Sequence, residues 1–246
     1  MADSRVLVDG EQIPPEPNVL SSRRALLVFA DELGIDMAKR RFPSVLRPLF
    51  RLSGKTFGTS GAEVHIFTSQ GDARTDARIH PQVGATFAER LENAVECLAR
   101  LDYDHIVAIG RDCPSLTSDD IDVAFALLRE NRLVLGPDHR GGCYLIAVRA
   151  TDRELLDGIR WKRNTDCAEL RARCHESEVC LLAIKHDLDS WADIRLLARV
   201  GDAAGRLAAF LVGLLQSTAR EFIYFVDLAA QAVRVRGQMP PPVSAA

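Results

Sequence analysis

An acidic residue follows a short apolar run near the middle of the chain. Residues 106–109 (IVAI) are typical of a buried strand, Gly110 ends the run, and Asp112 precedes Pro114. Open α/β sheets bind ligands and metals beyond the carboxyl ends of their strands. Asp112 therefore occupies a position that favours an enzyme working on a phosphorylated ligand, although a simple turn residue ahead of Pro114 is the alternative.

The residues around Asp112 predict the elements that would position it. Thr117, with Asp120 three residues later, is a capping box that predicts a helix over 118–130. Two further apolar runs, at 133–135 and 144–148, flank a Gly-Gly pair and predict two short strands.

The rest of the chain alternates between strand and helix patterns. Further strands are expected at 25–30, 62–67 and 179–184, and helices at 84–100, 165–175 and 190–200, with a proline-interrupted helical stretch at 37–52. Alternating strands and helices favour a mostly parallel sheet with helices on both faces. The Gly-Gly connection breaks this alternation and predicts a mixed sheet.

Composition limits the class of protein. The chain of 246 residues is long enough for one α/β domain, and its net charge of −3 gives no basic field for nucleic acid. No apolar run approaches the length of a membrane span, and the first residues lack the pattern of a signal peptide. We therefore expect a cytoplasmic protein with reduced thiols.

The central motif resembles a bacterial family. The matching residues are Gly110, Asp112, Cys113, Pro114, Leu116, Leu135, Gly136, Pro137, Gly141, Gly142, Tyr144, Leu145 and Ile146. Over roughly residues 25–200 the chain is similar to GT-A-type transferases, which are related to molybdenum-cofactor guanylyltransferases and other nucleotidyltransferases. The resemblance implies a three-layer, Rossmann-like α/β fold of the nucleotide-diphospho-sugar transferase superfamily, with a mixed sheet.

The resemblance, with the composition and helical patterns outside it, divides the chain. We expect a mobile arm over 1–22, the GT-A-like domain over 23–200, a helical extension over 201–236 and a tail over 237–246. The extension either pads the domain or forms a surface for a homodimer or another partner.

In the resembling family, the acid after the central strand coordinates a divalent metal that bridges the phosphates of the donor. Asp112 takes this place here, and Mg²⁺ or Mn²⁺ is the implied cofactor because both prefer oxygen ligands. Asp187 or Asp189, in a segment similar to the family's D-x-D-x-x-x-D-L, could approach the metal from the other side. Asp193 of the same segment completes a capping box with Ser190, which favours a structural role.

Other matches imply nucleotide binding. Lys39 and Arg41 match the family's basic first loop, which offsets phosphate charge. Gln82 matches a segment near the donor, and Gly141 and Gly142 match the family's glycine pair.

The departures from the family concern the catalytic side. Asp31 and Asp36 replace a lysine and a glycine of the first loop, and Arg140 replaces the acid before the glycine pair. A guanidinium cannot act as a base, so Asp138 is the candidate to replace that acid. Asp138 and Arg140 are thus the candidates on the acceptor side.

Further cations near the expected cleft are Arg111, Lys162 and Arg163. Either the acceptor is more anionic than the family's or the ancestral activity has been lost. We therefore carry three hypotheses: a glycosyltransferase using a nucleoside-diphosphate sugar, a nucleotidyltransferase acting on a phosphorylated acceptor, and a degenerate domain that binds a nucleotide or a partner.

Overall fold

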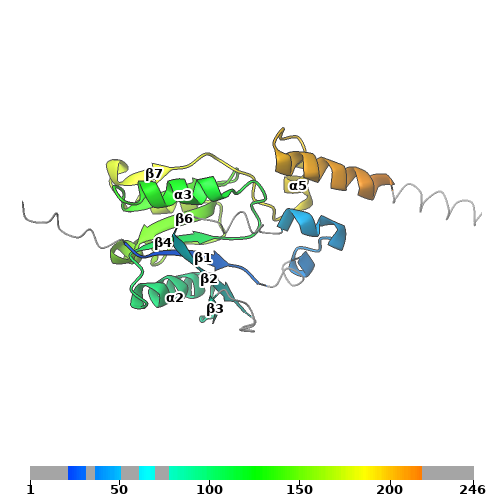
Figure 1. The fold of residues 1–246 in the computed structure, drawn as a ribbon. Helices are drawn as coiled ribbons and strands as arrows, with labels where there is room; N and C mark the ends of the chain where they lie inside the picture. The colour runs from blue at the N-terminus through cyan, green and yellow to red at the C-terminus, as the bar shows by residue number, and fades with distance from the viewer. Residues whose placement is uncertain (1–21, 32–36, 51–60, 70–77, 218–246) are drawn as a thin grey trace, which may run out of the picture.

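The structure, a computed structural model, describes residues 22–31, 37–50, 61–69 and 78–217. A seven-stranded sheet forms its centre (Figure 1). The strands are β1 (Arg24–Phe29), β2 (Ala62–Thr68), β3 (Arg78–Pro81), β4 (His105–Ile109), β5 (Leu133–Pro137), β6 (Cys143–Arg149) and β7 (Val179–Leu181). Their order in the sheet is β3-β2-β1-β4-β6-β5-β7.

The sheet is mixed, as the Gly-Gly connection predicts. β1 pairs in parallel with β2 and with β4, whereas β6 runs antiparallel to both β4 and β5. The link between β5 and β6 is short, and short links join antiparallel strands because a parallel pair needs a long crossover. β7 then returns in parallel beside β5.

Helices cover both faces of the sheet and give the predicted three layers (Figure 1). The helices are α2 (Phe87–Arg100), α3 (Ser118–Leu127), α4 (Asp166–Arg171) and α5 (Trp191–Leu197), with 3-10 turns η1 (Ser44–Phe50), η2 (Ala150–Leu156) and η3 (Glu176–Glu178). Leu91 and Val95 of α2 pack into the core on one face of the sheet, and Ile121 and Phe125 of α3 pack on the other.

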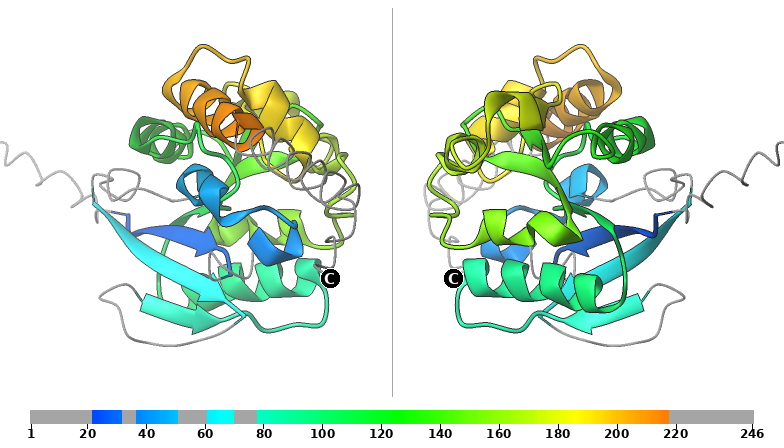
Figure 2. Two further views of the ribbon diagram at one scale, coloured as in Figure 1. Left: turned by 90° about the vertical axis from the view of Figure 1, so that its right-hand side faces the viewer. Right: turned by 90° about the vertical axis from the view of Figure 1, so that its left-hand side faces the viewer.

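A third apolar cluster lies beside the carboxyl ends of the strands. It joins Leu46 and Phe50 of η1 to Ile194 of α5 and to Ala208 and Leu211 of a helix over residues 203–217. These segments lie together on the right-hand side of Figure 1, the side that faces the viewer in the left view of Figure 2. The described part of the predicted C-terminal extension therefore shares a core with residues 37–50.

Some predictions fall partly or wholly outside the described residues: the N-terminal arm, Asp36, the end of the C-terminal extension and the tail. The predicted helix over 165–175 is shorter than expected, since α4 ends at Arg171 and η3 follows. The short edge strand β3 was not predicted. No helix in the described part of the chain has both the length and the apolarity to cross a membrane.

Candidate functional site

A cleft of about 460 Å³ lies beyond the carboxyl ends of β1 and β4. Asp112, Asp187 and Asp189 lie on its lining, together with Lys39 and Arg140. This is the edge of the sheet that the sequence predicts for ligands.

Asp112 lies at the end of β4 on a tightly folded loop. Its carboxylate turns back over Gly110, where an added Cβ would lie 2.4 Å from Asp112 Oδ1. Glycine is therefore required at 110 for this carboxylate to take its place. The side chain of Asp112 is 22% exposed and faces the cleft, where the sequence predicts it.

Asp187 is brought to Asp112 by the chain that follows β7. The N–H of Lys185 donates to the carbonyl of Pro137 (3.2 Å), and the N–H of Leu188 donates to the carbonyl of Asp112 (2.9 Å). Asp187 Oδ1 is buried and has no hydrogen-bond partner among the described residues. Burial raises the pKa of Asp187 well above its usual range, and the negative charges of Asp112 and Asp189 raise that pKa further.

This pair of acids fits a divalent cation. A bound cation would let both carboxyl groups ionise and would give the orphaned oxygen of Asp187 a partner. Among the described residues, no group of three or more His, Cys, Asp or Glu side chains forms a metal site. Mg²⁺ is commonly bound by one or two carboxylates plus substrate phosphates and water, so two acids suffice.

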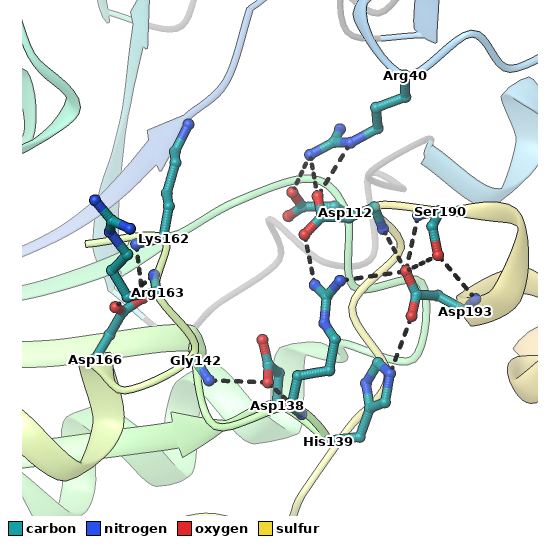
Figure 3. A network of polar contacts seen from close by, with 12 residues as sticks. Arg40, Asp112, Asp138, His139, Gly142, Lys162, Arg163, Asp166, Ser190 and Asp193 are labelled. Carbon is teal, nitrogen blue, oxygen red and sulfur yellow. Dashed lines mark hydrogen bonds and ion pairs between the residues drawn. The ribbon is translucent and has the colours of Figure 1, made fainter. Parts of the chain in front are cut away.

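The sequence predicts that Lys39 and Arg41 face the cleft, but the structure has Lys39 and Arg40 on the cleft lining. The Nη2 of Arg40 is 2.5 Å from Asp112 Oδ2 and 3.2 Å from Asp189 Oδ1 (Figure 3). Arg41 has a φ of 55°, is exposed, and is not part of the cleft lining. The sequence shows three consecutive cations here, and which one faces the cleft depends on a backbone turn that the pattern does not reveal.

Lys39 lines the cleft but is paired with Asp31, the acid that departs from the family pattern. The N–H of Ser69 also donates to Asp31 (3.0 Å). Burial alone would raise the pKa of Asp31, but the hydrogen bonds from Lys39 and Ser69 outweigh it and lower the pKa to about 2. The charge of Lys39, which the sequence predicts to bind phosphate, is therefore neutralised by Asp31.

Arg140 contacts neither Asp112 nor Asp187. Its guanidinium pairs with Asp189 (2.5 Å) and with Asp193 (3.3 Å). Asp193 forms the predicted capping box with Ser190 at the start of α5 and also lies 3.2 Å from His139 Nε2 (Figure 3). Asp189 thus bridges Arg40 and Arg140 and links the two sides of this network.

Asp138 holds the turn between β5 and β6. Its Oδ1 accepts the N–H groups of Arg140 (2.6 Å) and Gly142 (2.9 Å). Gly142 lies on the cleft lining, as does Asp138, whereas Gly141 supports the turn with a φ of 102°. A catalytic role for Asp138 or Arg140 stays a prediction.

Gln82 lines the cleft and donates from its amide to the carbonyl of Phe67 (3.0 Å). Of the two predicted cations that follow Trp161, Lys162 lines the cleft and Arg163 is exposed outside it.

Comparison with known proteins supports the fold. Residues 56–163 match the family model described as "Uncharacterized protein conserved in bacteria (DUF2064)". A protein from Desulfovibrio desulfuricans G20, provisionally named a nucleotide-diphospho-sugar transferase, superposes with a TM-score of 0.64 at 20% identity. The match covers 79% of this chain and 98% of that one.

More distant structures also match. A cytidylyltransferase from Leptospira borgpetersenii serovar Hardjo-bovis (strain JB197) has a TM-score of 0.49 and 12% identity, covering 81% of this chain and 96% of that one. A Mycobacterium tuberculosis H37Rv protein in complex with manganese has a TM-score of 0.46 and 14% identity, covering 72% and 98%. No curated protein sequence matches the chain. The structure from Desulfovibrio desulfuricans, at 20% identity, shows a shared fold, the three-layer mixed α/β fold that the central motif predicts.

Proposed function

We propose that the protein is a metal-dependent transferase that takes a sugar from a nucleoside-diphosphate sugar. The observation that carries the proposal is the pair Asp112 and Asp187 in the cleft, with one buried oxygen that has no partner among the described residues. Asp187 is buried beside the negative charge of Asp112, which raises the pKa of Asp187, and such an arrangement is costly unless a cation compensates it. The two acids lie at the edge of the sheet where α/β proteins bind ligands, so a cation held there would also contact the bound ligand.

The surrounding residues suit the phosphates of such a donor. Asp112 and Asp187 would hold Mg²⁺ or Mn²⁺, which supplies charge neutralisation for a departing diphosphate. Arg40 is paired with Asp112 and Asp189 and would turn to a phosphate once a metal replaces it at Asp112. Gln82 and Gly142 line the remaining donor surface.

A nucleotidyltransferase is the second candidate. It would use the same metal site with a nucleoside triphosphate and would join the nucleotide to a phosphorylated acceptor. Lys162 on the cleft lining favours this alternative, because a cation there suits an anionic acceptor.

A degenerate domain is the third candidate. The pairing of Arg40 with Asp112 favours it, because an arginine can replace a metal as the counter-charge.

A ligand screen separates the three candidates. The melting temperature would be measured with UDP-sugars, GDP-sugars and nucleoside triphosphates, each with and without Mn²⁺, because a ligand that binds only the folded state must stabilise it. Metal-dependent stabilisation by a nucleotide sugar supports the first candidate. Stabilisation by a triphosphate, with pyrophosphate release on turnover, supports the second. No response to any metal or nucleotide supports the third and would overturn the proposal.

A further inference from the structure

One wall of the cleft has a different chemistry from the acidic wall. It is formed by the first turn of α2 and by the residues before α4. Phe87 and Arg90 come from α2, and Trp161, Lys162 and Asn164 come from the segment before α4. Figure 3 shows Lys162 well apart from Asp112 and Arg40.

Two hydrogen-bond donors on this wall lack an acceptor. The Nε1 of Trp161 and the Nε of Arg90 are buried and make no hydrogen bond among the described residues. Buried donors in folded proteins nearly always have a partner. Both residues line the cleft, so a side-chain movement on ligand binding would bring these donors to an oxygen of the ligand.

The charge on this wall is also uncompensated. Lys39, Arg40 and Arg140, on the other parts of the cleft, are each paired with a carboxylate. The ammonium of Lys162 lies 4.5 Å from the centroid of the Phe87 ring and has no carboxylate partner in the described part of the chain. Lys162, together with Arg90, therefore gives this wall positive charge that attracts an anion.

The backbone of this segment is held in an uncommon conformation. Lys162 has a φ of 62° and Asn164 a φ of 58°, in the left-handed region that favours glycine. The carboxylate of Asp166 accepts the N–H groups of Lys162 (3.2 Å) and Arg163 (3.4 Å) and so fixes this turn. Backbone strain of this kind is typical of functional sites. Here a lysine occupies a backbone conformation that glycine would adopt at a lower energy cost.

We infer that this wall binds a phosphate group of the acceptor, through Lys162 with Trp161 Nε1 and Arg90 Nε. The inference rests on the proposed function, in which the phosphates of the donor lie at Asp112 and Asp187. It identifies the acceptor as a phosphorylated compound.

The test uses glycerol 3-phosphate as the probe and glycerol as its uncharged counterpart, with binding followed by calorimetry. The unmodified protein should bind glycerol 3-phosphate and not glycerol. Lys162→Gln should weaken that binding about tenfold, because a charge-assisted hydrogen bond is lost. Arg163→Gln is the matched control, since it removes the adjacent cation, which is not on the cleft lining, and should change binding less than about twofold.

The same variants are then titrated with UDP and Mn²⁺. Lys162→Gln should leave this affinity unchanged, which separates an acceptor phosphate from a donor phosphate. The inference is overturned if the unmodified protein does not bind glycerol 3-phosphate, if the two variants behave alike, or if Lys162→Gln weakens UDP instead. Lys162-dependent binding of glycerol 3-phosphate without any metal-dependent nucleotide binding would support the phosphate site and contradict the proposed donor. Melting temperatures of all three proteins show that the variants are folded.

Discussion

Arg40 Nη2 lies 2.5 Å from Asp112 Oδ2, so the acid proposed to hold the metal is already paired with a cation. The same guanidinium reaches Asp189 at 3.2 Å. A metal that binds Asp112 must displace Arg40. The displaced Arg40 would then be free to contact the phosphates of the donor.

This competition gives the first prediction. Arg40→Gln should tighten Mn²⁺ binding about fivefold, because a partly buried ion pair worth roughly 1 kcal/mol no longer opposes the metal. The same variant should weaken nucleotide binding in the presence of Mn²⁺, because a cation beside the phosphates is lost. Calorimetry measures both affinities.

Arg41→Gln is the control for Arg40→Gln, since Arg41 is exposed outside the cleft and the charge change is the same. Equal effects of the two variants would show that only general charge matters and would contradict a specific role for Arg40.

The second prediction concerns the packing of Gly136 in β5 against Tyr144 in β6. Gly136→Ala should destabilise the protein by about 1–3 kcal/mol, because the added methyl would lie 2.5 Å from the Tyr144 ring in a filled core. Denaturant unfolding measures the change.

Gly213→Ala is the matched control for Gly136→Ala, since nothing lies within 4 Å of the added Cβ and the residue is helical. It should stabilise the protein by up to about 1 kcal/mol. A harmless Gly136→Ala would show that β5 does not pack as described.

The third prediction concerns acid stability. His65 is fully buried, with Nδ1 2.9 Å from His80 Nε2 and Nε2 2.9 Å from the Tyr103 hydroxyl. Burial, helped by the charges of His80 and Arg78, lowers the pKa of His65 to about 4. The unfolded chain, with an ordinary histidine, binds the proton first as pH falls, so stability is present above about pH 6.5 and is lost toward pH 4.

The loss is up to about 3 kcal/mol for a shift of this size. Free energies of unfolding between pH 7 and pH 4 should therefore fall less steeply in His65→Gln than in the unmodified protein. His175→Gln, at an exposed histidine, should keep the original slope. Identical slopes in all three proteins would show that His65 is not held neutral.

Much of the fold follows from local patterns in the sequence. The apolar run before Asp112 forms β4, and the Gly-Gly pair places β6 antiparallel to its neighbours. The Thr117 and Ser190 capping boxes both form as predicted. These features depend on residues close together in the chain, which is why periodicity and capping reveal them.

The features that were missed depend on contacts between distant residues. β3 has four residues and no apolar run, so only its pairing with β2 makes it a strand. Arg40 pairs with Asp112, which is 72 residues away in the chain. Arg140 pairs with Asp189 and Asp193 rather than with the two acids proposed to hold the metal. Which cation meets which acid is decided by the tertiary fold.

The most direct test of the account is calorimetric titration of Mn²⁺ into the protein and into Asp112→Asn. Asp112→Asn keeps the shape of the side chain and removes its charge. We predict one Mn²⁺ site in the unmodified protein and an affinity lower by about tenfold or more in Asp112→Asn. Asp119→Asn, which removes an exposed acid of the first turn of α3, should bind Mn²⁺ as the unmodified protein does. No Mn²⁺ binding by the unmodified protein, with or without a nucleotide, would mean that Arg40 is the permanent partner of Asp112 and would contradict the account.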